Sequence, residues 1–243
     1  MRYLAYVMYD GYNYEGFQYQ NEETATIEKS LKEAFLILTK QNIKIYPSGR
    51  TDSKVHAKAQ TFHFDFNNIT NLDTFKEGLN RILPLDIRIT KILKVNDTFH
   101  ARHCAKMKEY RYYISKKEPT PFNNRYCAYV GDLNVSVMQK SISLFEGLHD
   151  FKAFSVTFKN SKPTTKIIYS AKIKETRDKI VIIFIGNSFL RYMVRRMVGL
   201  LIEIGKLKKD STIINEMFQN KENTIIYKTA IPMGLFLHKV YYK

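Results

Sequence analysis

Segments with the periodicity of strands alternate along this chain with segments that have the periodicity of helices. In the first half, apolar residues recur at helical spacing over Ile27–Leu38, and Thr26 is the expected N-cap. Phe62, Phe64 and Phe66 instead alternate with polar residues, which is typical of a half-buried strand. The second half repeats this alternation. Two halves of this kind indicate an α+β protein with helices packed on a broad mixed sheet.

The same periodicities place the remaining elements. Further strands are expected at Arg2–Asp10, Ile43–Ser48, Ile87–Val95, Tyr110–Ile114, Lys166–Thr176, Lys179–Asn187 and Leu235–Tyr242. Further helices are expected at Leu72–Ile82, Val137–Phe145 and Phe189–Lys206. No low-complexity tract or long linker separates these segments.

The charge of the chain favours a polyanionic partner. Lysine and arginine number 39 against 23 aspartate and glutamate residues, which gives a net charge of +16. Contacts between basic side chains and phosphates supply most of the sequence-independent affinity for nucleic acids. An AT-rich genome, which enriches lysine, asparagine and isoleucine, is the alternative explanation. Composition alone therefore leaves nucleic-acid binding open.

Three features bear on the compartment and on metal content. No apolar stretch approaches the roughly 20 residues that a membrane helix needs. The N-terminus enters a strand pattern at Arg2, which leaves no room for a signal peptide. Cys104 and Cys127 lack metal-ligand spacing and do not indicate a disulfide framework. We expect a soluble, cytoplasmic protein without a structural metal.

The segment Ser48–Ala57 holds the residues best suited to chemistry. It lies between two expected strands, where loops present functional side chains from a rigid scaffold. Arg50 is two residues before Asp52, so it could bind a phosphate while the carboxylate faces a sugar and base. A tight turn in which Asp52 bonds to local backbone explains the same residues. The residues by themselves leave both interpretations open.

This segment, Ser-Gly-Arg-Thr-Asp-Ser-Lys-Val-His-Ala, resembles the catalytic motif of the TruA family of tRNA pseudouridine synthases, usually (A/S)-G-R-T-D-x-G-V-H-A. Other segments resemble family motifs and follow in the expected order. They are Tyr9–Gln18, Phe99–Arg102, Tyr110–Tyr112, Met193–Gly199 and Met233–Leu237. Each match is weak alone, but six in order across nearly the whole chain make chance very improbable.

The resemblance implies a role for particular residues. Asp52 matches the essential aspartate, Tyr110 the active-site tyrosine, and Arg195 the arginine that pairs with the aspartate. Residues assigned to substrate binding are Arg50, Lys54, His56 and Leu235. His56 and His63 are otherwise expected to be structural.

The resemblance also implies a fold and an assembly. Two tandem ferredoxin-like halves form one mixed, mostly antiparallel central sheet, with helices on one side and a cleft between the halves. Residues 1–107 are the N-terminal half with the aspartate loop, and residues 108–243 are the C-terminal half with the tyrosine and arginine. A homodimer is expected, because relatives bind one tRNA across both subunits.

The implied reaction needs no cofactor or metal, because pseudouridine formation adds no atom and changes no oxidation state. The carboxylate either removes a proton from the sugar or bonds to the nucleotide, and the sequence leaves both open. In the helix from Phe189, Arg195 lies almost opposite the main apolar stripe. We expect this helix to pack on one side and face the cleft on the other. Arg196 is the alternative if the register differs.

One position departs from the family pattern. Lys54 stands where the family usually has glycine, and Ser53 where it often has alanine. If that position needs a positive φ, lysine strains the loop or alters its path. The tRNA anticodon stem-loop is the expected substrate, and ribosomal RNA (23S type) is the alternative. A non-catalytic RNA-binding module is less favoured, and a nuclease still less, for lack of metal ligands.

Overall fold

The protein forms two compact units in a computed structural model that describes residues 1–156, 163–219 and 227–243. The first unit comprises Met1–Lys106 and Phe236–Lys243, and the second comprises Met107–Leu235. Both units combine strands and helices, which confirms the α+β class. Residues 236–243, assigned to the C-terminal half from the sequence, belong to the first unit.

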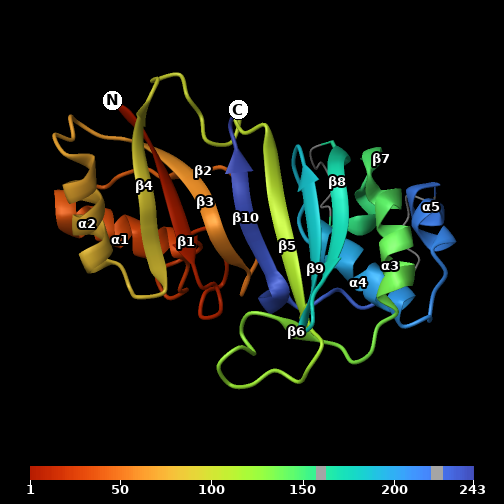
Figure 1. Ribbon diagram of the computed structural model, residues 1–243. Helices are drawn as coiled ribbons and strands as arrows, with labels where there is room; N and C mark the ends of the chain where they lie inside the picture. Colours follow the sequence, from red (N-terminus) through yellow and green to blue (C-terminus); the bar gives the residue numbers. More distant parts are fainter. Residues whose placement is uncertain (157–162, 220–226) are drawn as a thin grey trace. The chain divides into compact units, whose positions relative to one another are not determined.

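The first unit is a mixed sheet with two helices (Figure 1). Its strands are β1 (Arg2–Tyr9), β2 (Tyr46–Pro47), β3 (His56–Asp65), β4 (Ile87–Val95) and β10 (Leu235–Tyr241), and its helices are α1 (Ile27–Thr39) and α2 (Leu72–Ile82). The strands follow the order β4-β1-β3-β10, and β2 also pairs with β3. Strand β1 is antiparallel to β3 and β4, whereas β10 is parallel to β3.

Side-chain caps and aromatic packing explain why the helices of this unit form where they do. The Thr26 side chain accepts a 3.2 Å hydrogen bond from the backbone of Lys29, which confirms the expected N-cap of α1. Phe35 of α1 packs on Phe64 of β3 with ring centroids 4.8 Å apart. Phe75 of α2 contacts both rings, so the two helices cover the same face of the sheet (Figure 1).

Strand β3 differs from its expectation in length and burial. It begins at His56, ends at Asp65 before Phe66, and buries Thr61 and His63 as fully as the alternating phenylalanines. The expectation of a half-buried strand was therefore wrong. The segment 96–106 packs against this second face, because His63 accepts a hydrogen bond from the backbone of Ala101.

The second unit is also a sheet with helices. Its strands are β5 (Met107–Ser115), β6 (Ala128–Tyr129), β7 (Gly147–Asp150), β8 (Thr165–Glu175) and β9 (Lys179–Gly186); its α-helices are α3 (Val135–Ile142), α4 (Met193–Gly205) and α5 (Thr212–Gln219); and its short 3-10 helices are η1 (Ser143–Phe145), η2 (Lys152–Phe154) and η3 (Pro232–Gly234). Strands β5, β9, β8 and β7 are antiparallel neighbours in that order, and β6 pairs parallel with β5.

Helix α4 carries the apolar stripe expected from the sequence, but it starts later. Met193, Met197, Leu200 and Ile204 are fully buried, as the periodicity predicts. The helix begins at Met193 rather than Phe189, because Tyr192 adopts a left-handed conformation with φ 62°. None of the helices in the described ranges combines the length and hydropathy of a membrane span.

Candidate active site

The loop that carries Asp52 is fixed to strand β3 at its start. Ser48 and Gln60 are both fully buried. The Ser48 hydroxyl donates a 2.7 Å hydrogen bond to the Gln60 side-chain oxygen, and the Gln60 amide nitrogen donates one of 2.8 Å to the Gly49 carbonyl. Two buried side chains thus fix the backbone three residues before the aspartate.

The Tyr/Gly-rich loop at residues 10–18 holds the backbone just before Asp52. The hydroxyl oxygens of Tyr9 and Thr51 are 2.8 Å apart, and burial raises the pKa of the Tyr9 phenol, which therefore stays neutral. The backbone N–H of Phe17 donates to the Thr51 carbonyl at 3.2 Å. Gly16 has φ +95°, and a Cβ there would lie 2.7 Å from the same carbonyl oxygen. Glycine is therefore required at this contact.

The same loop holds the backbone that follows Asp52. A turn joins the Val55 N–H to the Asp52 carbonyl at 3.2 Å, and the Lys54 N–H donates to the Tyr14 carbonyl at 3.1 Å. A Cβ at Gly11 would lie 2.0 Å from the Val55 carbonyl oxygen, so only glycine fits there. The aspartate is thus held between two backbone contacts to one neighbouring loop.

The side chains of the aspartate loop differ in their access to solvent. Asp52 is half-buried, whereas Arg50 and Lys54 are exposed. The Lys54 ammonium lies 5.8 Å from the centre of the Tyr12 ring, within cation–π range. The loop therefore presents one carboxylate with a basic side chain two residues away on each side.

His56 is part of the support of this loop. Its side chain is fully buried, and its ring stacks on Phe236 with centroids 4.6 Å apart. Its Nδ1 lies 3.0 Å from a carboxylate oxygen of Asp10 and 3.1 Å from the backbone nitrogen of Gly11. Nδ1 donates to the carboxylate in one tautomer and accepts from the amide in the other. Both contacts tie the aspartate loop to the Tyr/Gly-rich loop.

Tyr110 and Arg195 belong to the second unit. Tyr110 is 8% exposed in β5, and its ring meets the ring of Phe189 edge-on with centroids 4.9 Å apart. The Arg195 Nε donates a 2.8 Å hydrogen bond to the Ala230 carbonyl, and its guanidinium lies 5.0 Å from the centre of the Tyr192 ring. The Ala230 carbonyl and the Tyr192 ring thus hold the Arg195 side chain in place.

The segment before η3 packs against helix α4. The Ala230 N–H donates to the Arg195 carbonyl at 3.1 Å, and a Cβ at Gly199 would lie 2.2 Å from the Lys228 carbonyl oxygen. The side of α4 opposite the apolar stripe is therefore covered near Arg195. Arg196 instead donates to the Ser155 carbonyl at 3.3 Å. Leu235, the remaining residue assigned to substrate binding, is 4% exposed.

The structure brings Arg50, Asp52 and Lys54 together on one loop of the first unit and places Tyr110 and Arg195 in the second. Throughout the described part of the chain, no three His, Cys, Asp or Glu side chains form a group that could hold a metal ion.

Comparisons with known proteins identify the class. A family profile described as "tRNA pseudouridine synthase" matches residues 142–243. The "tRNA pseudouridine synthase A" of Phytoplasma mali is 40% identical over 241 residues, 99% of this chain and 98% of the relative. The protein of the same name from an Exiguobacterium species is 38% identical, over 98% of this chain and 96% of the relative. A solved archaeal box H/ACA Nop10–Cbf5 complex, 13% identical over 82% of this chain and 43% of that chain, has a TM-score of 0.33, too low to bear on the fold.

An α+β fold, an aspartate loop fixed by backbone contacts, and relatives that match over nearly the full length define an RNA-modifying isomerase. The chain belongs to the tRNA pseudouridine synthase A family.

Proposed function

We propose that the protein isomerises uridine to pseudouridine in the anticodon stem-loop of tRNA, with Asp52 as the catalytic carboxylate. The observation that carries this proposal is the loop that presents half-buried Asp52 between exposed Arg50 and Lys54. Backbone contacts to the Tyr/Gly-rich loop fix its position on both sides. A reacting carboxylate needs such preorganisation, because small displacements sharply reduce the rate.

The reaction breaks the N1–C1′ bond, turns the uracil and rejoins it to the sugar through C5. Asp52 acts on the sugar as a base or as a nucleophile, and both roles require an ionised carboxylate. We assign Arg195 the role of keeping that carboxylate ionised through its positive charge. We assign Tyr110 the role of stacking on the uracil once it has left the helix. The ring of Phe189, edge-on to Tyr110, limits the orientations available to it.

Binding of the RNA depends mainly on charge in this proposal. The chain has a net charge of +16, and two of its basic side chains flank Asp52. Arg50 and Lys54 contact phosphates beside the flipped uridine, and the affinity for RNA falls steeply as salt increases. His56 contributes by holding the loop, and Leu235 by lining the substrate site.

We further propose a cytoplasmic homodimer in which one tRNA contacts both subunits. This assembly follows from the resemblance to the family. Size-exclusion chromatography with light scattering, with and without tRNA, tests it: a monomer that binds tRNA with full affinity would contradict it.

The test of the function is to incubate the wild-type protein separately with unmodified tRNA and with ribosomal RNA transcripts, and then to map pseudouridine. We expect modification in the anticodon stem-loop of tRNA. Modification confined to ribosomal RNA would overturn the substrate but keep the reaction. No modification of either RNA by folded protein would favour a binding module.

A further inference from the structure

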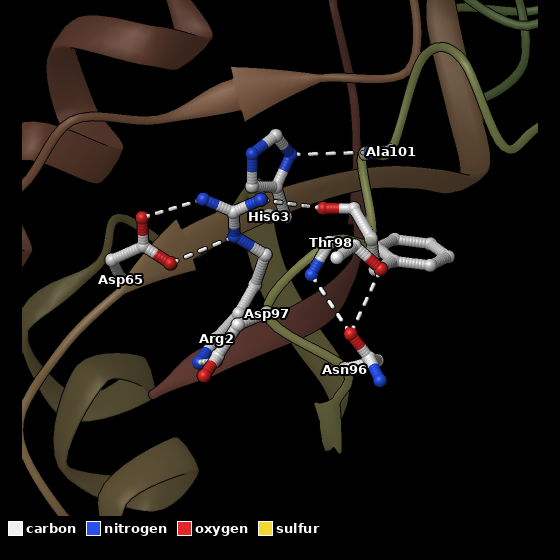
Figure 2. A network of polar contacts seen from close by, with 8 residues as sticks. Arg2, His63, Asp65, Asn96, Asp97, Thr98 and Ala101 are labelled. Carbon is white, nitrogen blue, oxygen red and sulfur yellow. Dashed lines mark hydrogen bonds and ion pairs between the residues drawn. The ribbon is translucent and has the colours of Figure 1, made fainter.

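A segment of the first unit, residues 96–106, forms a strap over the sheet face opposite the helices. Both backbone groups of Ala101 are hydrogen-bonded. Its N–H donates a 3.2 Å hydrogen bond to His63 Nδ1, and its carbonyl accepts one of 2.9 Å from the Tyr242 hydroxyl. Arg2 adds a 2.8 Å hydrogen bond from its guanidinium to the Phe99 carbonyl (Figure 2). Ala101 is fully buried, so the strap is fixed at its middle.

Aromatic rings gather where the strap meets β2 and β3. Tyr46 and His63 are cross-strand neighbours whose rings stack at 4.7 Å and 14°. The His100 ring of the strap lies 4.6 Å from His63, and the His103 ring lies 4.3 Å from His100. Tyr46 is 40% exposed, whereas the His63 ring beneath it is almost fully buried. A buried ring thus supports an exposed one.

Charges of both signs lie near this supported ring. Arg2 acts electrostatically on Tyr46 and His63, but its guanidinium is paired with the Asp65 carboxylate at 2.8 Å. Arg102, two residues after His100, is exposed. Burial, together with His100 and Arg2, lowers the pKa of His63 to about 4, so the imidazole under Tyr46 is neutral near pH 7. A neutral, flat support under an exposed ring favours stacking of a flat aromatic ligand such as a nucleobase.

The cluster lies beside the start of the aspartate loop. Tyr46 is two residues before Ser48, where that loop begins, and six residues before Asp52. The Ser48 N–H donates a 2.8 Å hydrogen bond to the carbonyl of Thr61, two residues from His63 on β3. Any base held at Tyr46 is therefore bound next to the loop that carries Asp52.

We propose that Tyr46, supported by His63 and His100, is a stacking platform for an unpaired base of the substrate RNA. The inference rests on the proposed function, because it deepens how that substrate is held. Stacking of one base on an aromatic side chain contributes enough to change affinity by roughly 5- to 100-fold. The platform therefore acts on binding and leaves the chemical step unchanged.

The direct test uses tryptophan fluorescence, since the chain contains no tryptophan. Tyr46→Trp introduces a single fluorophore that an unmodified tRNA transcript should quench on stacking. Tyr169→Trp is the matched control, because Tyr169 is a similarly exposed tyrosine of β8 in the second unit, at 50%. Quenching at position 46 but not at 169 supports the platform. An unchanged signal at position 46, or equal quenching at both, would overturn it.

The kinetic test separates this proposal from the proposed function. Tyr46→Ala should raise KM for tRNA roughly 5- to 100-fold with kcat unchanged, and Tyr46→Phe should match the wild type because it keeps the ring. A wild-type KM for Tyr46→Ala would overturn the platform. If Tyr46→Ala does not fold, quenching of Tyr46→Trp by tRNA still tests the platform, and the KM of Tyr46→Phe still tests whether the ring alone is enough. Failure of the proposed function is distinguishable, because the wild type would then form no pseudouridine while RNA quenching stayed measurable.

Discussion

The backbone N–H of Lys54 donates a 3.1 Å hydrogen bond to the carbonyl of Tyr14, and Lys54 adopts φ 62° to make it. This left-handed conformation is the one that glycine adopts without cost. The position where the family usually has glycine therefore does need a positive φ. Lysine keeps the turn at a conformational cost and adds a cation two residues from Asp52.

The substitution Lys54→Gly should raise the free energy of unfolding by about 1 kcal/mol, because relief of the left-handed strain exceeds the entropy lost by glycine. Urea denaturation measures the change. The control is Lys58→Gly, an exposed lysine inside β3, where glycine should instead lower stability by about 1 kcal/mol. A loss of stability in Lys54→Gly would show that the lysine side chain contributes more than its backbone costs.

The substitution Asp52→Asn should abolish pseudouridine formation, because a neutral amide cannot act as a base or a nucleophile. Fold and tRNA affinity should change little, since backbone hydrogen bonds hold the loop on both sides of Asp52. Single-turnover assays with unmodified tRNA give the rate. Asp73→Asn, which removes an exposed carboxylate of α2, is the control and should keep full activity. Turnover of Asp52→Asn at a few per cent of wild type would contradict the assignment.

Local signals predicted part of the fold well. The N-cap and apolar periodicity of α1, and the bounds of α2 and β4, are those expected, because spacing and capping act within a few residues. Helix α5 and strands β6 and β7 were not predicted. Strand β6 has only two residues and forms by pairing with β5, which is a tertiary contact that no local pattern encodes.

Longer-range packing also explains the errors at helix and strand ends. Phe189 continues the spacing of the α4 stripe, so periodicity alone extended the helix past the left-handed residue Tyr192. In the sequence Thr61 and His63 have the pattern of a solvent-facing side of β3, but both are buried, because the strap contacts His63 and Tyr242 contacts Thr61. Gln60, which anchors the aspartate loop, was missed because a single polar residue in a strand carries no pattern.

The candidate site was predictable only through resemblance. Asp52 in a loop between strands is equally compatible with an ordinary turn, and the Val55-to-Asp52 hydrogen bond is such a turn. The motif order, not the geometry of any residue, indicated the reaction. The catalytic roles of Asp52, Tyr110 and Arg195 stay predictions.

The substitution Gly199→Ala should destabilise the second unit by about 2 kcal/mol, although alanine favours helices. Its Cβ would lie 2.2 Å from the Lys228 carbonyl oxygen and would push the neighbouring segment away from Arg195. The midpoint of urea denaturation and the value of kcat should both fall. Gly78→Ala in α2 is the control, since its Cβ meets only the flexible side chain of Leu38 at 3.1 Å, and it should be near neutral. If Gly199→Ala were as stable as the wild type, the segment around Lys228 would be shown to move aside without cost.

The histidine beneath Tyr46 makes stability depend on pH. Four groups face its imidazole: His100 of the strap, Arg2 of β1, Asp65 of β3 and Tyr46 of β2. Burial, His100 and Arg2 lower the pKa of His63 from 6.5 to about 4, against an opposing effect of Asp65. The folded state thus holds this imidazole neutral at a pH where the unfolded chain has already protonated it.

The free energy of unfolding should therefore fall by about 3 kcal/mol from His63 alone as the pH drops from 6.5 to 4, because only the unfolded state binds the proton in that window. Below pH 4 both states are protonated and this contribution stops changing. Urea denaturation at pH 7.5, 5.5 and 4.5, roughly spanning the window, measures the loss. His63→Asn keeps an acceptor for the Ala101 N–H without titrating, so it should lack most of this drop. The control His149→Asn, in the second unit, should lose as much unfolding free energy on acidification as the wild type does. An equal pH dependence of the wild type and His63→Asn would refute the role of His63.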